Sequence, residues 1–226
     1  MKTKTWSEHL LSFYKGLKPP GHLPNNIEWL YPQQDAAVMT IVETFLNRYY
    51  NDQNPRTILL GINPGRFGAG VTGVNFTAPK QLKEICGIDH SFKNQSELSA
   101  EFIYEMMNAY GGAEKFYSHF FIGSVCPLGF VKHGKNINYY DDKQLLEIVE
   151  PFIIKNISRL IDFNTRETCF SIGGEKNYRY LSSLNQKHKW FDKIVPLPHP
   201  RFIMQYRRKQ KQQFIQQYLQ LITKIG

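Results

Sequence analysis

Cysteine is scarce in this sequence, and the few cysteines that occur are far apart. Cys86, Cys126 and Cys169 include no C-x-x-C pair. Disulfide frameworks, zinc ribbons and iron–sulfur clusters all need paired or closely spaced cysteines. The sequence therefore argues against these three classes. We expect a protein of a reducing cytoplasm that uses neither a metal nor another cofactor.

Long apolar runs are also missing. No stretch reaches the roughly 18 apolar residues that span a bilayer. The first nine residues include basic side chains but lack the apolar core of a secretory signal. We therefore expect no association with a membrane.

Acidic residues are too few to balance the basic ones. The chain has 28 Lys and Arg against 19 Asp and Glu, which gives a formal net charge of +9. A surplus of this size attracts polyanions such as nucleic acids, although a merely basic surface would give the same count. Several cations are concentrated just before the C-terminus: Arg201, Arg207, Arg208, Lys209 and Lys211.

What is present is the composition of a globular protein. Hydrophobic residues make up 42% of the 226 residues, and no repeat, low-complexity tract or linker divides the chain. We therefore expect a single domain over residues 1–226. Short runs rich in β-branched or aromatic residues predict four buried strands: 57–62, 116–125, 167–172 and 193–197.

Helical patterns fill much of the chain between these strands, and residues 18–34 are predicted as a loop. Strands that alternate with helices indicate a mostly parallel sheet covered on both faces. The predicted fold is therefore α/β, a three-layer α/β/α sandwich around a central four-stranded, mostly parallel sheet. The predicted helices are 36–50, 97–110, a segment that begins at Asp141 or Asp142 and kinks or restarts at Pro151, and about 203–224.

The most informative segment is the turn after the first predicted strand, Gly61-Ile62-Asn63-Pro64-Gly65. Gly and Pro force a tight turn and allow a ligand to approach the backbone. The turn places Asn63 at the carboxyl end of a buried strand, where α/β proteins bind their ligands. A lone Asn-Pro-Gly is more often a plain turn, so this interpretation needs a second motif.

A histidine follows the last predicted strand in a similar way. The run 193–197 leads into Pro198, His199 and Pro200, which places His199 at the same edge of the sheet as Asn63. An amide can orient a water but does not take up a proton. An imidazole can donate a hydrogen bond to developing negative charge. The pair suits a reaction whose leaving group departs early and carries charge, such as release of a nucleobase by cleavage of an N-glycosidic bond.

A third segment follows the second predicted strand, with Cys126-Pro127-Leu128 and then Gly134-Lys135-Asn136. Together with residues 61–68 and Thr72-Gly73-Val74-Asn75-Phe76, it resembles the SMUG-type (single-strand-selective monofunctional) family of the uracil-DNA glycosylase superfamily. That family carries G-M-N-P-G-P-F-G, T-G-V-P-F, C-P-L…G-x-N and H-P-S-P-R in this order. Order, spacing and strand context agree over roughly residues 57–208.

The resemblance implies a role for each matching residue. Asn63 would position the attacking water, and His199 would stabilise the departing uracil anion near its O2 oxygen. Phe76 would stack on the flipped base, and Asn136 would read its N3–H and O4. Gly65 stands where relatives with strict uracil selectivity have a bulky residue, which leaves room for substituents at C5 of the base. The other residues implied to bind the substrate are Gly61, Ile62 and Phe67.

The sequence also departs from the family pattern. Arg66 and Asn75 each replace a proline, and the motif at His199 lacks the family's Ser and second Pro, so the chain resembles a divergent, bacterial-type branch. The segment after His199 mixes cations with large apolar side chains, which is typical of a loop that fills the gap left by a flipped base. The other interpretation is a helical turn with a solvated basic face. The residues expected to contact DNA are Arg201, Phe202, Gln205, Tyr206, Arg207 and Arg208.

The implied partner is DNA that contains uracil or a related damaged base. The implied location is the cytoplasm, at the bacterial nucleoid, and a monomer is the simplest assembly. Two other functions stay open: a non-catalytic nucleic-acid-binding protein of the same fold, and a nucleotide-binding α/β enzyme that uses residues 65–70 or 171–176 as phosphate turns. Neither segment matches an established phosphate-binding motif.

Overall fold

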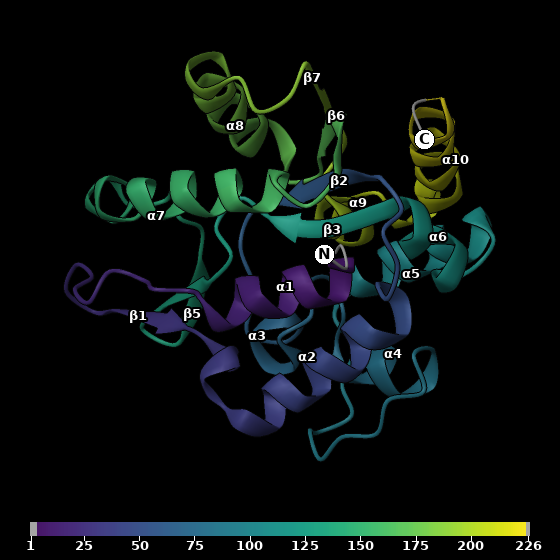
Figure 1. Cartoon of the computed structure of the whole chain (residues 1–226), viewed down its shortest axis with the longest axis horizontal. Coiled ribbons are helices and arrows are strands. Elements are labelled where there is room, and N and C mark those ends of the chain that lie inside the picture. Colours follow the sequence, from purple (N-terminus) through teal and green to yellow (C-terminus); the bar gives the residue numbers. More distant parts are fainter. Residues whose placement is uncertain (1–3, 225–226) are drawn as a thin grey trace.

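The four predicted strands form one parallel sheet at the centre of the molecule. The computed structural model describes residues 4–224 and orders the strands β3-β2-β6-β7, with every neighbouring pair parallel. Helices lie on both sides of this sheet (Figure 1), which confirms the predicted three-layer α/β/α sandwich. The strands are β2 (Arg56–Gly61), β3 (Phe120–Ser124), β6 (Thr165–Ser171) and β7 (Lys193–Pro196).

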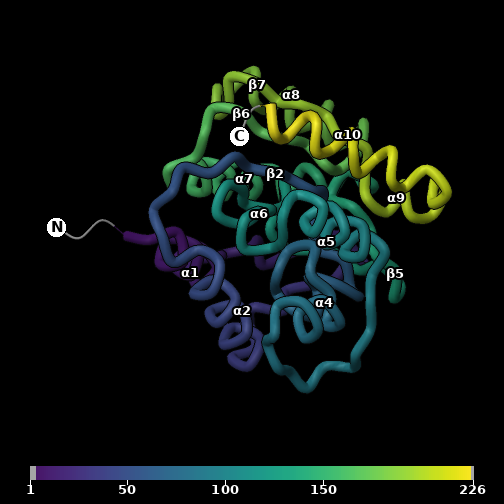
Figure 2. The backbone as a smooth tube through the Cα atoms, turned by 90° about the vertical axis from the view of Figure 1, so that its right-hand side faces the viewer, coloured from purple at the N-terminus to yellow at the C-terminus, as the bar shows by residue number. Residues whose placement is uncertain are grey.

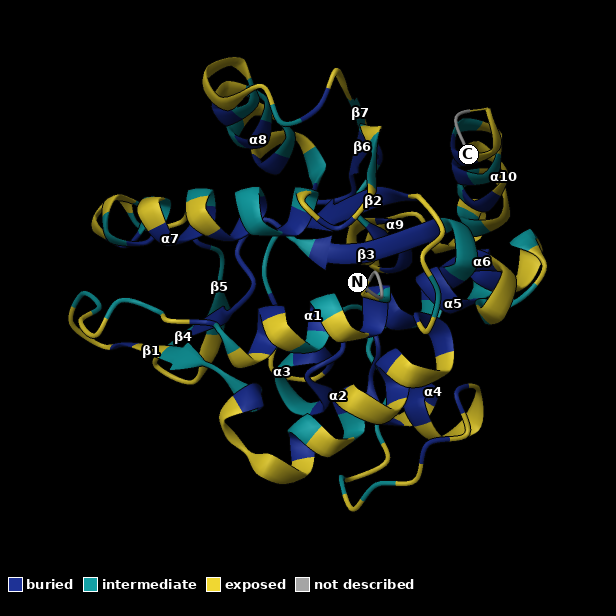
Figure 3. Ribbon diagram, in the orientation of Figure 1, coloured by how far each residue is buried: buried dark blue, intermediate teal, exposed yellow. Residues whose placement is uncertain are grey.

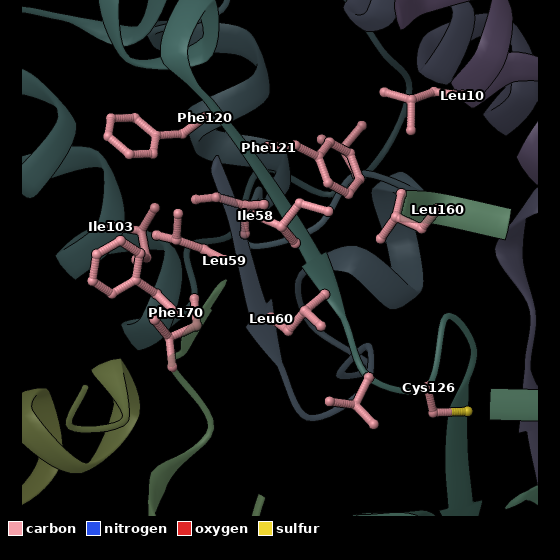
Figure 4. Close-up of a cluster of buried hydrophobic side chains, with 14 of the residues drawn as sticks. Leu10, Ile58, Leu59, Leu60, Ile103, Phe120, Phe121, Cys126, Leu160 and Phe170 are labelled. Atoms are coloured by element: carbon pink, nitrogen blue, oxygen red, sulfur yellow. The ribbon is translucent and has the colours of Figure 1, made fainter. Parts of the chain in front are cut away.

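Burial explains why β2 is apolar from Ile58 to Leu60, after the buried Arg56 and Thr57. All six of its residues are buried, since β2 pairs with a strand on each edge and helices cover both faces. The central strands are accordingly dark blue in Figure 3. In Figure 4, Leu10 and Leu160 lie on one side of β2, and Ile103 and Phe170 lie on the other. Alternation along the pleated strands therefore divides the core into two layers.

Different helices build these two layers. On one face α8 lies beside α7, where the Tyr180 hydroxyl donates a hydrogen bond to Glu150 (3.1 Å). On the other face α10 packs on α5 through Tyr218 and Phe102, whose ring centroids are 5.1 Å apart. The helices are α1 (Trp6–Lys15), α2 (Ala36–Tyr49), α3 (Ala69–Thr72), α4 (Pro79–Glu84), α5 (Leu98–Tyr110), α6 (Ala113–His119), α7 (Lys143–Ile161), α8 (Gly174–His188), α9 (Pro200–Tyr206) and α10 (Lys211–Thr223), with 3₁₀ turns η1 (Pro32–Gln34) and η2 (Arg208–Gln210).

Two predicted helices, α2 and α5, are confirmed with nearly the expected bounds. α7 begins after Asp142, whose carboxylate accepts hydrogen bonds from the N–H groups of Gln144 and Leu145 at 3.0 and 3.1 Å. The helix continues through Pro151 as one segment, so the restart does not occur. None of the helices within residues 4–224 is long and apolar enough to cross a membrane.

The sequence did not predict a second sheet, which is antiparallel and has the order β1-β4-β5. β1 (Ile27–Leu30) lies inside the segment 18–34, so the prediction of a loop is wrong for these residues. β4 (Gly129–Lys132) and β5 (Lys135–Ile137) form a hairpin next to it. Strands of three or four residues carry too little alternation to be recognised without their partners.

The predicted strand 116–125 begins too early. Residues 113–119 form α6, and β3 starts only at Phe120. Phe116 and Tyr117 are both buried, but they reach the core from a helix. Aromatic content therefore indicated burial correctly and the type of element wrongly, because strand propensity depends on the packing context.

The predicted C-terminal helix over about 203–224 is in fact two helices. His199 caps α9, and Pro200 occupies its first position, so the helix starts three residues earlier than predicted. Arg207 leaves the helical conformation with φ −132° and ψ 24°, and η2 then leads into α10. Residues 205–210 are all exposed, so no buried side chain holds this stretch in one continuous helix. α9 and α10 both pack along α5 (Figure 2).

Candidate active site

The turn after β2 carries Asn63 out of the sheet. It begins at Gly61, where a Cβ atom would lie 2.6 Å from the Phe76 ring, so only glycine allows this ring to pack on the strand end. Phe76 itself has a left-handed backbone (φ 52°), which is unusual for a large side chain. Backbone strain of this kind is concentrated at functional sites. The end of β2 and the Phe76 ring therefore pack directly against each other.

Asn63 is held in place by the segment that follows β5. Its Oδ1 accepts a hydrogen bond from the Tyr139 N–H (3.1 Å), and its Nδ2 donates to the Ile137 carbonyl (3.3 Å). These two bonds fix which end of the carboxamide is the acceptor. A carbonyl oxygen accepts two hydrogen bonds, so Oδ1 retains capacity to orient a water.

His199 is fixed by the start of α9. Its Nδ1 accepts a hydrogen bond from the Arg201 N–H (3.0 Å), which places the ring proton on Nε2. Burial, and secondarily the positive charge of Arg201, lowers the pKa of His199 from 6.5 to about 4. The side chain is therefore a neutral imidazole at neutral pH, and Nε2 is a hydrogen-bond donor.

Asn63 and His199 line the same cavity, which has a volume of about 430 Å³. The structure thus brings together side chains that are 136 positions apart, as expected for two carboxyl ends of one parallel sheet. The sequence-predicted site residues that line this cavity are Ile62, Asn63, Gly65, Phe67, Phe76, Asn136, His199, Arg201, Phe202, Gln205 and Tyr206. Gly61, Arg207 and Arg208 do not line it: Gly61 lies under the Phe76 ring, and the two arginines lie beyond α9.

Asn136 reaches the cavity from β5. Its Oδ1 accepts a hydrogen bond from the backbone N–H of Arg66 (3.1 Å), in the turn after β2. Gly65 lies close by, since a Cβ atom built on it would be 3.2 Å from Nδ2 of Asn136. A side chain at position 65 would therefore press on Asn136.

The rim of the cavity carries exposed aromatic rings. Phe67 and Phe202 are each 44% exposed and Tyr206 is 61% exposed, and all three line the cavity. Large apolar side chains rarely stay exposed side by side unless they contact a partner. The guanidinium of Arg207 lies over the Phe202 ring at 5.6 Å, and Arg208 pairs with Glu101 at 3.9 Å. This rim of cations and rings has the character of a nucleic-acid contact surface.

Several residues that line the cavity were not predicted from the sequence. Ser124 donates a hydrogen bond to Oδ1 of Asn75 (2.8 Å), and Nδ2 of Asn75 donates to the Tyr14 hydroxyl (3.2 Å). Ser124 is the last residue of β3, so its place at a carboxyl strand end could have indicated it. Tyr140 and Glu97 also line the cavity, and no motif in the sequence marks them.

Three further observations concern the cysteines, metal binding and the turn after β6, where Gly173 also lines the cavity. All three cysteines are buried and unpaired. The described residues, 4–224, contain no cluster of three or more His, Cys, Asp or Glu side chains that could hold a metal ion. Gly173 and Gly174 lie where β6 leads into α8. This is a plain strand-to-helix turn, the alternative to a phosphate-binding turn over residues 171–176.

Comparison with known proteins defines the class to which this fold and site belong. A sequence model of the uracil DNA glycosylase superfamily matches residues 48–223. The chain therefore belongs to this superfamily. The family resemblance carried by the Asn63 and His199 motifs is confirmed.

Within the superfamily, the chain is similar to two SMUG-type proteins. The crystal structure of wild-type SMUG2 of Pedobacter heparinus matches with a TM-score of 0.93 and 44% sequence identity, over 98% of this chain and 98% of that one. The single-strand selective monofunctional uracil-DNA glycosylase of Rattus norvegicus is 29% identical over 140 residues, which cover 51% of this chain. The chain spans about half the length of this curated relative, as the match covers 50% of it.

Proposed function

We propose that this protein is a monofunctional uracil-DNA glycosylase, which removes uracil or a related damaged pyrimidine from DNA and leaves an abasic site. The observation that carries the proposal is the placement of the Asn63 carboxamide and the neutral His199 imidazole on one cavity of about 430 Å³. Such a volume is ordinary for a small-ligand pocket. The same proposal includes one domain over residues 1–226, a monomer, and a cytoplasmic location at the DNA.

The reaction begins with extrusion of the target nucleotide, which costs a few kcal/mol. The base enters the cavity and stacks on Phe76, and the amide of Asn136 binds the pyrimidine edge. The exposed rings of Phe202 and Tyr206 on α9, next to the cation of Arg207, fill the space that the base leaves in the duplex. Extrusion thus exchanges stacking in DNA for stacking on the protein.

Bond cleavage then depends on electrostatics. The bond between the sugar C1′ and the base nitrogen breaks, and its electron pair leaves with the ring. Nε2–H of His199 donates a hydrogen bond to the ring oxygen O2, which carries much of this charge. Oδ1 of Asn63 orients a water whose oxygen bonds to C1′, and the water proton passes to solvent because an amide does not accept it. No cofactor enters these steps.

The pKa of His199 predicts the pH dependence of the reaction. With a pKa of about 4, the imidazole stays neutral across the neutral range, so the excision rate should show no inflection near 6.5. Single-turnover excision rates should therefore stay constant from neutral pH down to about one pH unit above the pKa of His199. A rate that rises as the pH falls through 6.5 would mean that the imidazolium is the active form, and would contradict the assignment.

The same shift has a consequence for folding. Below pH 6.5, His199 binds a proton in the unfolded chain. In the folded protein it stays neutral until the pH approaches about 4. Stability must therefore fall as the pH is lowered through this window. The His199→Gln variant cannot show this part of the decline, so the urea midpoint of the wild type should fall more between neutral pH and pH 4 than that of the variant.

Gly65 predicts a broad base range. A glycine leaves the cavity wall open near C5 of the base, so 5-hydroxymethyluracil should be excised as well as uracil. In the Gly65→Ala variant, whose Cβ would lie 3.2 Å from Nδ2 of Asn136, the rate for 5-hydroxymethyluracil should fall more than the rate for uracil. Gly21→Ala is the matched control, since nothing lies within 4 Å of a Cβ there. Efficient cutting of uracil with none of 5-hydroxymethyluracil by the wild type would contradict the inference.

A duplex with a single deoxyuridine tests the proposed function. Strand scission at that position only after hot alkali is the expected result, because it reveals an abasic site in an intact strand. Scission without alkali would contradict a monofunctional enzyme. Gel retardation without scission would favour the non-catalytic nucleic-acid-binding protein, and tight ATP or NAD binding in a thermal-shift assay would favour the nucleotide-binding enzyme.

A further inference from the structure

The Phe76 ring is carried by a tight turn over residues 74–77. The Thr77 N–H donates a hydrogen bond to the Val74 carbonyl (3.2 Å), and φ is positive at Phe76 (52°) but not at Asn75. This is the pattern of a type II turn, whose third residue needs a left-handed backbone. Glycine usually occupies that position, and a large side chain there is unfavourable. Other contacts must therefore hold the turn in the form that presents the ring to the cavity.

The second position of such a turn is often a proline, because its ring fixes φ. The family motif T-G-V-P-F has proline at this position, and the present chain has Asn75. Within residues 4–224 the backbone N–H of Asn75 has no hydrogen-bond partner. The asparagine therefore lacks the conformational restraint of proline and makes no backbone hydrogen bond that replaces it.

The side chain of Asn75 makes two contacts that a proline could not make. Its Oδ1 accepts a hydrogen bond from the hydroxyl of Ser124 (2.8 Å), the last residue of β3. Its Nδ2 donates to the hydroxyl of Tyr14 (3.2 Å), a buried residue of α1. The carboxamide thus ties the second position of the turn to the central sheet and to the first helix, through residues 49 and 61 positions away.

Two threonines support the same turn through its backbone. Oγ1 of Thr72 accepts from the Val74 N–H (3.1 Å) and donates to the Thr77 carbonyl (2.7 Å). Oγ1 of Thr77 donates to the Asn75 carbonyl (3.2 Å). All of these bonds use backbone groups that any residue at position 75 would leave in place. The contacts that depend on asparagine are the two bonds of its carboxamide.

We propose that Asn75 is a positioning residue, whose carboxamide takes the place of the proline ring in fixing the turn that presents Phe76 to the flipped base. This inference rests on the proposed function, in which the base stacks on Phe76. Proline restrains the turn covalently, whereas Asn75 restrains it through Ser124 and Tyr14. The helix α1 is thereby part of the support of the active site.

The first test compares Asn75→Ala, which has neither restraint, with Asn75→Pro, which has the covalent one. Single-turnover excision of uracil should slow by about tenfold in Asn75→Ala, the equivalent of about one net hydrogen bond. In Asn75→Pro the rate should stay close to that of the wild type. An unchanged rate in Asn75→Ala, or an equal loss in both variants, would overturn the proposal.

A double-mutant cycle separates positioning of the ring from a general loss of stability. If Asn75 acts through the ring, Asn75→Ala should cost less than about twofold in a protein that already carries Phe76→Ala, because coupled residues are not additive. The full tenfold loss in that background would overturn the positioning role. Normal excision of uracil by Phe76→Ala alone would instead count against the proposed function.

A further measurement reports on the turn without any activity. The Thr77 N–H closes the turn, so its hydrogen exchange, followed by NMR, measures how often the turn opens. Exchange should be about tenfold faster in Asn75→Ala than in the wild type, and it should return to the wild-type rate in Asn75→Pro. Unchanged exchange in Asn75→Ala would overturn the proposal even if the protein cuts uracil.

Discussion

Replacing His199 with alanine is expected to slow uracil excision by about 10²–10³-fold in single-turnover assays, the usual cost of removing one pre-placed donor to an oxyanion. The reason is the Nε2–H, which is available because the Arg201 N–H holds Nδ1 and because burial keeps the ring neutral. Binding to a duplex with a non-cleavable 2′-fluoro-deoxyuridine should be largely kept. Unchanged excision would refute the assignment.

His199 also caps α9, so the alanine variant loses both the Nε2–H donor and the helix cap. His199→Ser separates them, because serine caps helices well but has no donor in the place of Nε2. The serine variant should regain stability, since a lost cap costs about 1 kcal/mol. Its excision rate should stay as low as that of the alanine variant. Recovery of activity by serine would mean that His199 acts only by holding α9.

Replacing Asn63 with alanine should also slow excision, by at least about 10²-fold, because a water displaced by even 1 Å loses that much rate. The Oδ1 of Asn63 is oriented by the Tyr139 N–H, so the variant loses both the acceptor for water and a contact to the segment after β5. Near-normal turnover in this variant would contradict the role assigned to Asn63.

Two variants serve as controls for this prediction. Asn63→Asp keeps an oxygen that can orient water and loses the Nδ2 donor to the Ile137 and Pro64 carbonyls, so it should retain more activity than the alanine variant. Asn51→Ala removes an exposed carboxamide that precedes the amino end of β2, at the opposite edge of the sheet. It should leave the rate unchanged. Equal losses at positions 51 and 63 would point to a general defect rather than to the site.

The sequence predicted those parts of the fold that follow from local patterns. β2 is a buried apolar run that ends in Gly and Pro, and the rule for parallel sheets then placed Asn63 and His199 at one edge. Their common cavity agrees with this expectation. The helices α2 and α5 were predictable for the same reason, since each carries a clear helical period.

The features that the sequence did not predict depend on contacts between segments that are distant in the chain. The hydrogen bond from Tyr139 to Asn63 joins residues 76 positions apart, and it is made by a backbone group that has no sequence signature. The short strand β1 exists only because β4 pairs with it. The break between α9 and α10 reflects the absence of buried side chains over residues 205–210, which becomes visible only after the helices have packed on α5.

The most direct test is a crystal structure of the protein with a duplex that holds one non-cleavable 2′-fluoro-deoxyuridine. The expected result is an extrahelical uracil in the cavity, stacked on Phe76, with its O2 within hydrogen-bond distance of Nε2 of His199 and a water between Oδ1 of Asn63 and C1′ of its sugar. A uracil that stays stacked in the duplex, or that lies outside this cavity, would contradict the account.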